Sequence, residues 1–383
     1  MTSRRSNQGV AAWPAVALVV LLGCPASGGG GAPADAGAGG AAATGGATAT
    51  GGATATGGAT ATGGATATGG VAGTSGPPPS GGVPGSGGVA TGSGGGPGNG
   101  PGGAGGGGPS AYDQVVLAAG PVAFWAMANG AGTEPDLTGH GNTGTYRHGP
   151  TAKSALPNGD AAADFDGASQ YLTVPSASAF SITTTGLLTW EAWLQPDVLQ
   201  FPNASDDGYV DWMGKCQDYA PSCEWEARMY SLNTPQGRPD RLSAYVFNPG
   251  ANLGSAADWQ PTSGLIEAGR WYHVVGAYTL KTAPADCQNT TMYPGAIDIW
   301  VNGVKWDHAA HGQTGCMSQY QVAPVAGSSP LNIGTMAMDT WFAGAVGKVA
   351  LYDRLLTSDE IATHYRTMTG HAPTGSCADQ CNF

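Results

Sequence analysis

The first hundred or so residues contain almost none of the residues that build a folded core. From residue 25 to about 110 the chain has no aromatic side chain and a single charged residue, Asp35. The hexapeptide TGGATA occurs four times in tandem from Thr44 to Ala67, but it offers no large apolar side chain to stack inside a β-solenoid. Because so little surface can be buried, nothing offsets the backbone entropy lost on ordering. We therefore expect residues 24–110 to be a disordered linker with a span of about 50 Å.

Long apolar runs are also absent, apart from Val10–Leu22. This run is too short to span a bilayer as a mature helix, and Arg4 and Arg5 precede it. A basic start followed by a short apolar run is typical of a cleaved signal peptide, which we place at residues 1–23. A twin-arginine signal is less consistent with the polar Ser6-Asn7 that follow the two arginines.

The apolar run ends in Leu21-Leu22-Gly23-Cys24, which resembles the lipobox of bacterial lipoproteins. The resemblance implies cleavage before Cys24 and attachment of lipid to its sulfur, and the alternative is an ordinary secretory signal with a chance cysteine. Several acyl chains make such an anchor stable, whereas one chain is marginal. Pro25 replaces the Asp that retains lipoproteins in an inner membrane, so we expect the cell envelope, at an outer membrane.

Basic residues are scarce, since the whole chain has 14 Lys and Arg against 26 Asp and Glu. Without Arg4, Arg5 and Asp35, the part that can fold has 12 basic residues against 25 acidic ones. A protein of this charge is repelled by nucleic acid and by anionic lipid surfaces, so neither is expected as a direct partner. We expect a monomer.

Cysteine use is consistent with export. Apart from Cys24 there are six cysteines, which allow fifteen disulfide pairings. Proximity in the sequence favours three pairs: Cys216–Cys223, Cys287–Cys316 and Cys377–Cys381. The alternative for one of them is a zinc site formed by Cys316 with His308 and His311, but no paired-cysteine knuckle of metal spacing accompanies these residues.

Residues from about 111 onward contain nearly all the aromatic and charged side chains, and their apolar residues recur with period two. Turn residues interrupt this pattern about every ten positions, which predicts short antiparallel strands. We expect strands at 122–127, 161–165, 171–174, 188–194, 209–214, 226–232, 241–247, 271–278, 297–301, 304–306, 331–333 and 345–352. An all-β chain of this kind predicts two antiparallel sheets packed face to face in a jelly roll.

Local signals place a few elements firmly. Ser110 with Asp113, and Thr357 with Glu360, have the spacing of helix capping boxes and predict short helices at the start and end of the domain. Asn302-Gly303 separates two alternating runs and predicts a hairpin with a type I′ turn. Ile297, Ile299 and Val301 then face the core, so we interpret this hairpin as scaffold.

A series of short motifs follows in a fixed order over some 240 residues. They are AFW at 123–125, DLTGHGN at 136–142, FDG at 165–167, YLTVP at 171–175, TWEAW at 189–193, WYHVV at 271–275, WVNG at 300–303, LNIG at 331–334, and FAGAV at 342–346 running to LYDRLLT at 351–357. This order resembles the LamG-like jelly-roll domains of the concanavalin A-like lectin/glucanase superfamily. The resemblance covers residues 111–370, leaves a cysteine-containing tail at 371–383, and implies a concanavalin A-like sandwich.

Glutamate is rare, which limits the catalytic interpretations. Glucanases of this superfamily use paired carboxylates on one strand, in the pattern Glu-x-Asp-x-(x)-Glu. None of the six Glu residues begins this pattern. Glu224 and Glu226 could share one face of a strand, but they lack an intervening Asp and a third acid. The strand residue Glu191 is interpreted as a hydrogen-bonded structural acid, and no catalytic residue is assigned.

The resemblance also suggests a calcium site. Related domains bind Ca²⁺ with the Asp and Asn of the Asp-x-Ser-Gly-x-x-Asn turn, which correspond to Asp136 and Asn142. Lys348 lies where related domains have a further acid, and it would repel the ion or replace it as the counter-charge to Asp136. Because Ca²⁺ requires six to eight oxygen ligands, a metal-free turn is the alternative.

Ligand binding could use the tryptophans. Trp125, Trp190, Trp193, Trp271 and Trp300 lie on expected strands and should be core. Five others lie near expected loops or strand ends, where an exposed indole could stack on a sugar: Trp212, Trp225, Trp259, Trp306 and Trp341. Of these we take Trp225 and Trp259 as the first candidates, although packing under a loop would explain each one.

The sequence therefore predicts a non-catalytic, lipid-anchored envelope protein for binding or adhesion, whose LamG-like sandwich recognises a glycan or an extracellular protein. One alternative is a carbohydrate-active enzyme, which would bring two of Glu191, Glu224, Glu226 and Asp298 within about 5–10 Å in a cleft. Another is an envelope-structural protein with no soluble ligand.

Overall fold

The computed structural model describes residues 108–374, except 150, 155, 218–222, 240, 249–252, 261–265 and 289–291. The chain divides into two units, 1–91 and 92–383, and every described residue lies in the second. The predictions for the signal peptide, for Cys24, for nearly all of the linker and for Cys377–Cys381 lie outside the described residues. Within the described part, no helix has the length and apolar character needed to cross a bilayer.

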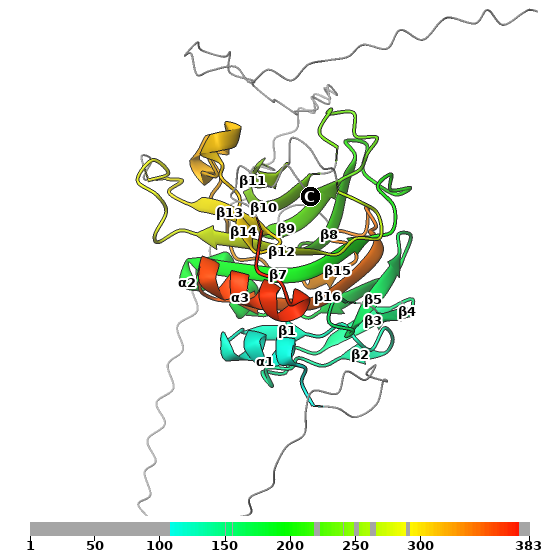
Figure 1. Ribbon diagram of the computed structural model, residues 1–383. Coiled ribbons are helices and arrows are strands. Elements are labelled where there is room, and N and C mark those ends of the chain that lie inside the picture. Colours follow the sequence, from blue (N-terminus) through cyan, green and yellow to red (C-terminus); the bar gives the residue numbers. More distant parts are fainter. Residues whose placement is uncertain are drawn as a thin grey trace, which may run out of the picture. The chain divides into compact units, whose positions relative to one another are not determined.

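The predicted two-sheet sandwich is confirmed, with entirely antiparallel pairing (Figure 1). The first sheet has the order β14 (Val304–Lys305), β13 (Ala296–Val301), β12 (Tyr272–Thr279), β7 (Leu187–Pro196), β16 (Ala343–Tyr352), β5 (Ala161–Asp166) and β4 (Thr151–Ser154), with β1 (Ala123–Trp125) also paired to β16. The second has the order β11 (Leu253–Trp259), β10 (Leu242–Asn248), β9 (Trp225–Tyr230), β8 (Tyr209–Lys215), β15 (Leu331–Ile333), β6 (Tyr171–Val174), β3 (Gly144–Arg147) and β2 (Thr133–Glu134).

The main core lies between the two sheets. It contains alternate residues of their strands, among them Trp190 on β7 and Trp212 on β8, whose rings meet edge to face at 5.6 Å. Ile297, Ile299 and Val301 of β13 belong to this core, as predicted. Asn302 and Gly303 have φ of 51° and 80°, which confirms the predicted hairpin and its left-handed turn residues.

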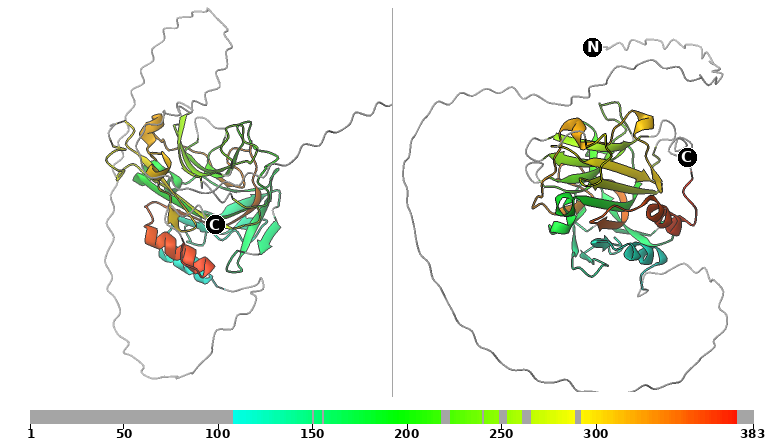
Figure 2. Two further views of the ribbon diagram at one scale, coloured as in Figure 1. Left: turned by 45° about the horizontal axis from the view of Figure 1, so that its top comes forward. Right: turned by 90° about the vertical axis from the view of Figure 1, so that its left-hand side faces the viewer.

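Two helices cover the other face of the first sheet. α1 (Ala111–Ala118) and α3 (Ser358–Thr369) both begin at the predicted capping boxes, with reciprocal bonds between Ser110 and Asp113 and between Thr357 and Glu360. They lie together along the sheet (Figures 1 and 2), and a second apolar cluster fills the space beneath them. The strand β7 is consequently buried on both faces, although its sequence alternates apolar and polar residues.

Smaller elements connect the strands: α2 (Ile182–Thr185) and three short 3₁₀ segments, Ser178–Phe180, Ala309–His311 and Met317–Tyr320. Four strands were not predicted, namely β2, β3, β4 and β11. β11 reads Leu253-Gly254-Ser255-Ala256-Ala257-Asp258-Trp259 and has no β-branched residue, so it lacks the usual strand signal. It forms because its backbone pairs with β10 along its whole length.

Cys216 is bonded to Cys223, and Cys287 to Cys316, which agrees with two of the three predicted pairs. The second bridge closes a segment of 29 residues that contains the β13–β14 hairpin.

Candidate functional site

The indoles chosen first as sugar-stacking candidates are not exposed. Trp225 is completely buried and Trp259 is 4% exposed, and both belong to the core between the sheets. Trp225 is the first residue of β9 and its Nε1 donates to the Phe180 carbonyl at 2.8 Å, while Trp259 ends β11. The expectation of exposed rings at these positions was wrong, because both residues lie on inward-facing strand positions and not in loops.

Only two tryptophans in the described residues are partly accessible, Trp271 and Trp341. Trp271 precedes β12 and packs against the cluster under the helices. Trp341 lies in the loop between β15 and β16, and its ring meets that of Tyr171 edge to face at 6.0 Å. The ring of His148, which is exposed, also lies near Tyr171, with the two ring centroids 6.4 Å apart.

The face of the second sheet that points away from the first has an unusual concentration of aromatic rings. Tyr209 on β8, Arg228 and Tyr230 on β9, and Tyr245 on β10 form what we call the tyrosine–arginine cluster. The guanidinium carbon of Arg228 lies 4.3 Å from the ring centre of Tyr209 and 4.0 Å from that of Tyr245. Its Nη2 donates to the Tyr230 hydroxyl at 2.9 Å. The arginine is therefore held between two tyrosine rings by cation–π contacts.

Strand pairing produces this arrangement. Tyr209 lies opposite Tyr230, Asp211 opposite Arg228, and Tyr245 opposite Glu226, so these side chains share one face of three neighbouring strands. Residues between them in sequence, such as Ala227 and Ala244, point into the core. On the edge strand β11, a Cβ on Gly254 would overlap the ring of Tyr245, so glycine is required for this ring to lie flat on the sheet.

The exposure of the cluster is graded. Tyr209 and Tyr245 are partly exposed, whereas Arg228 is 7% exposed and Tyr230 is buried. Gln236 and Arg238, both partly exposed, border it: the Gln236 amide donates to the Tyr209 hydroxyl at 2.5 Å, and the Arg238 guanidinium lies 5.2 Å from the Tyr230 ring centre. The two outer rings and this polar border are therefore accessible, while the less exposed Arg228 lies between the rings and holds them in place.

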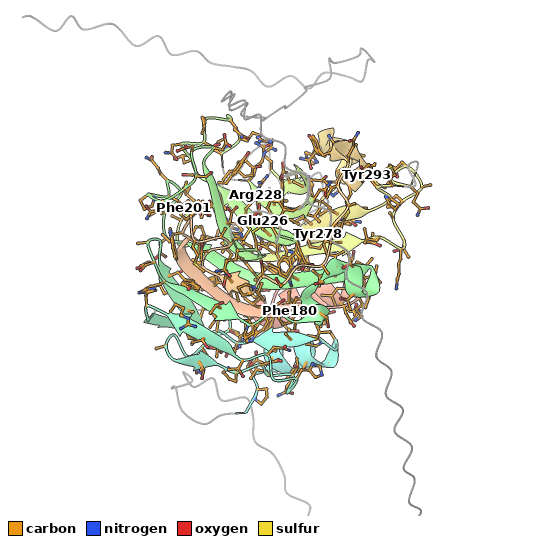
Figure 3. All side chains as sticks on the ribbon, turned by 180° about the vertical axis from the view of Figure 1, so that it is seen from behind. Phe180, Phe201, Glu226, Arg228, Tyr278 and Tyr293 are labelled. Carbon is orange, nitrogen blue, oxygen red and sulfur yellow. A yellow bond between two sulfur atoms is a disulfide. The ribbon has the colours of Figure 1, made fainter. Side chains whose placement is uncertain are left out.

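A buried carboxyl lies beside the cluster. Glu226 is 1% exposed, and its Oε1 lies 3.4 Å from Nη1 of Arg228 (Figure 3). Burial, together with the charge of Asp211, raises the pKa of Glu226 well above its usual range, against the opposing effect of Arg228. Burial also raises the pKa of Tyr245 to about 12, so its hydroxyl remains protonated at neutral pH.

The remaining acids of the enzymatic alternative have separate partners. Glu224 pairs with Lys215 at 2.6 Å and accepts hydrogen bonds from Ser181 and from the backbone of Gly327. Asp298 pairs with Lys305 at 3.0 Å and lies 3.5 Å from His308. Among the described residues, Glu224, Glu226 and Asp298 have no hydrogen-bonding partner in common.

Glu191 has the structural role that the sequence suggested. It is completely buried on the helix-covered face of β7, where it accepts hydrogen bonds from the Tyr352 hydroxyl at 2.5 Å, from His364 Nδ1 at 3.0 Å and from His273 Nε2 at 3.2 Å. Burial alone would raise the pKa of its carboxyl, but the two histidines outweigh burial and hold this pKa well below its ordinary value. The carboxylate thereby ties α3 to the first sheet.

The predicted calcium ligands do not form a cation site. The two oxygens of Asp136 accept five hydrogen bonds, from the backbone of Phe124, from the backbone and hydroxyl of Thr138, and from the backbone and amide of Asn142. Asn142 thus directs its NH₂ group at the carboxylate, where a shared ion would require its oxygen. Burial would raise the pKa of Asp136, but these donors lower it. This donor set fits a metal-free turn and not Ca²⁺.

Lys348 does not balance Asp136, so that part of the expectation was wrong. Its Nζ lies 2.6 Å from Asp113 Oδ1 and 2.8 Å from Asp160 Oδ2, and its side chain is 3% exposed. The lysine therefore ties β16 to the N-terminus of α1, a contact between residues 235 positions apart.

The zinc alternative is also excluded by geometry. Asp286, Cys287 and Cys316 lie close together, but the two sulfur atoms are bonded to each other and are not thiolates. His308 lies near Asp298, and the ring of His311 stacks on Trp306 with centroids 3.7 Å apart.

The fold and the aromatic face together define a β-sandwich with a solvent-facing ring cluster on one sheet. The sequence matches the concanavalin A-like lectin/glucanases superfamily over residues 166–362, just over half of the chain, and the protein belongs to this family. No curated protein matches the chain.

Several solved structures have a similar fold. Domain 4 of the arabinanase AbnA from Geobacillus stearothermophilus is 17% identical with a TM-score of 0.40, over 64% of this chain and 98% of that one. The binding domain of Paraclostridial Mosquitocidal Protein 1 is 12% identical with a TM-score of 0.43, over 64% and 52%. Trypanosoma rangeli sialidase is 17% identical with a TM-score of 0.43, over 66% and 33%. The family assignment rests on the sequence match alone.

Proposed function

We propose that this protein is a glycan-binding protein whose site is the outer face of the second sheet. The observation that carries the proposal is the placement of Tyr209 and Tyr245, two partly exposed rings fixed on either side of Arg228. Aromatic faces held in one orientation can pack against the C–H faces of sugar rings, and the hydroxyl groups of tyrosine can hydrogen-bond to the sugar. Because Arg228 fixes the rings before binding, little side-chain entropy is lost when a ligand binds.

The border of the cluster supports a polar ligand. Gln236 and Arg238 offer planar groups beside the rings, and they can donate hydrogen bonds to sugar hydroxyls. Two rings with a polar border are more consistent with a sugar than with a protein partner, since stable protein interfaces are built around a large buried core.

A glycan array tests this proposal with residues 92–383, a fragment that contains every residue of both core clusters. We expect the wild-type fragment to bind defined glycans. The double substitution Tyr209→Ala and Tyr245→Ala should weaken binding at least tenfold, or about 1.4 kcal/mol. Tyr320→Ala is the matched control, because this tyrosine is also exposed but lies outside the second sheet. Equal binding by the double variant and the wild type would refute the assignment of the site.

A glycoside hydrolase is a second candidate function, and Glu226 is the observation that favours it. Burial raises the pKa of Glu226, which favours the protonated carboxyl that a general acid requires. Incubating each bound glycan with the fragment, and with its Glu226→Gln variant, distinguishes the two functions. Binding without release of new reducing ends supports a binding protein, whereas release that Glu226→Gln abolishes supports an enzyme.

The proposed setting is a lipid anchor on Cys24 at the outer membrane, with residues 24–110 as a tether for a monomeric domain. Its support comes from the lipobox-like end of the apolar run and from the composition of the linker. Fractionation of cells that express the full chain tests it. Wild-type protein should be recovered with outer membranes, and Cys24→Ala should shift it out of the membrane fraction. An unchanged distribution would contradict lipidation at this residue.

A further inference from the structure

We propose that the ligand of this face is an oligosaccharide chain lying across the strands, with the tyrosine–arginine cluster at one end and Trp341 with Tyr171 at the other. The inference rests on the proposed glycan-binding function and adds the size and direction of the ligand. It depends on two groups of partly exposed rings that lie on the same sheet face but do not touch each other in the described residues.

Strand alternation places both groups on one side of the second sheet. Leu172 and Val174 of β6 are core residues, so Tyr171 points to the opposite face. On β8, Val210 is a core residue and its neighbour Tyr209 points outward in the same way.

Sheet order sets the separation of the two groups. Between Tyr245 and Tyr171 the strands run β10-β9-β8-β15-β6. Four strand spacings amount to about 19 Å, and the two spacings from β8 to β6 to about 10 Å. A single sugar ring cannot contact both groups across this distance, whereas a chain of several units can.

Pairing places Tyr171 level with the middle of β8, between Tyr209 at the start of that strand and Gly214, which lies across β9 from Tyr245. Ile333 of β15 lies opposite Met213 on one side and Leu172 on the other. Immediately after it, the backbone of Gly334 donates to the Trp212 carbonyl at 2.8 Å, so the loop that leads to Trp341 starts beside the middle of β8.

The loop between β15 and β16 contains the buried apolar residues Met336 and Ala337, and it also offers polar groups to a ligand. The Thr340 hydroxyl donates to the Asp211 carboxylate at 3.2 Å and accepts from the Asp211 backbone N–H at 3.0 Å. These two hydrogen bonds fix the loop on the sheet face. Asp339, next to Thr340, is exposed, and so is Asn203, whose carbonyl accepts from the Trp341 backbone at 3.2 Å. These groups can hydrogen-bond to the hydroxyls of a sugar chain that passes from one aromatic group to the other.

The experiment measures affinity against chain length by calorimetry with residues 92–383. The probes are ladders of one to six units of cello-, xylo-, arabino- and laminari-oligosaccharides. With the ladder that binds, affinity should rise by at least tenfold from two to six units. Trp341→Ala should return the affinity for six units to that for two units, and it should leave the affinity for two units unchanged.

Trp271→Ala is the matched control, because Trp271 is the other partly exposed tryptophan and lies against the first sheet. It should change no affinity, and thermal unfolding should confirm that both variants are folded. This inference would be overturned if affinity did not rise with chain length, or if Trp341→Ala bound the six-unit chain as tightly as the wild type. Either result would leave the proposed function intact. No binding of any ladder by the wild type would count against the proposed function itself.

Discussion

Replacing Glu191 with alanine tests the account of how the first sheet and α3 are held together. The carboxylate is fully buried and accepts from three donors, the Tyr352 hydroxyl, His364 Nδ1 and His273 Nε2. Alanine leaves all three donors buried without an acceptor. It also removes the negative charge beside His364, whose pKa is raised by Glu191 against the opposing effect of burial.

The size of the effect follows from these contacts. An unsatisfied buried donor costs about 1–3 kcal/mol, and removing one partner of a buried ion pair costs about 3–5 kcal/mol. Because the three hydrogen bonds share one acceptor, the costs overlap, and we expect a loss of about 4 kcal/mol. For a domain of this size each kcal/mol lowers Tm by about 2–4 °C, so Tm should fall by roughly 10 °C.

Urea unfolding followed by circular dichroism measures this loss. Glu191→Gln should lower the free energy of unfolding by about half as much. Its amide oxygen can still accept from the Tyr352 hydroxyl, and a histidine that changes tautomer can accept from its NH₂ group. The control is Glu267→Ala, since Glu267 is exposed and lies 3.6 Å from Arg270; its loss should be below about 0.5 kcal/mol. If Glu191→Ala came within about 1 kcal/mol of wild type, the carboxylate would not hold the sheet and helix together.

Three further outcomes follow from the charged groups. The raised pKa of His364 means that its stabilising effect is complete below the unfolded pKa near 6.5 and is lost as pH rises through the folded pKa. In urea unfolding, the stability gap between wild type and His364→Asn should therefore shrink as pH rises above about 6.5, and a widening gap would contradict this. Lys348→Met leaves the buried Asp113 and the partly exposed Asp160 without a counter-charge and should cost about 3 kcal/mol at pH 7 in urea unfolding, and a loss below about 1 kcal/mol would contradict this. Calcium and chelator should leave Tm unchanged because donors already occupy the oxygens of Asp136, and a rise in Tm with calcium would reveal a site.

Much of the fold could be predicted because its signals are local. The capping box at Thr357 and the turn at Asn302-Gly303 depend on residues a few positions apart, and both are confirmed. β11 was missed for the opposite reason: its residues have weak strand propensity, and only pairing with β10 makes them a strand. Trp259 consequently lies outside the expected strands, although it packs in the core.

The candidate site could be predicted only in part. Trp341 was among the tryptophans considered for stacking, and it is the one of those five that is partly exposed. The tyrosine–arginine cluster was missed because Tyr209, Arg228 and Tyr245 lie on three different strands, and no local pattern links them. Alternation within each strand could have shown that each side chain points outward, but not that they meet.

Local patterns were enough to predict that residues beyond about 110 form short strands that pack as a sandwich, because hydrophobic period and turn chemistry are properties of neighbouring residues. The polar partnerships, in contrast, arise from contacts between distant parts of the fold. Lys348 reaches Asp113 and Asp160 and not Asp136, Glu191 receives two histidines from different elements, and Arg228 lies between two tyrosines. Such contacts depend on strand order and helix placement, which are fixed by the burial of the whole chain and not by any short stretch of it.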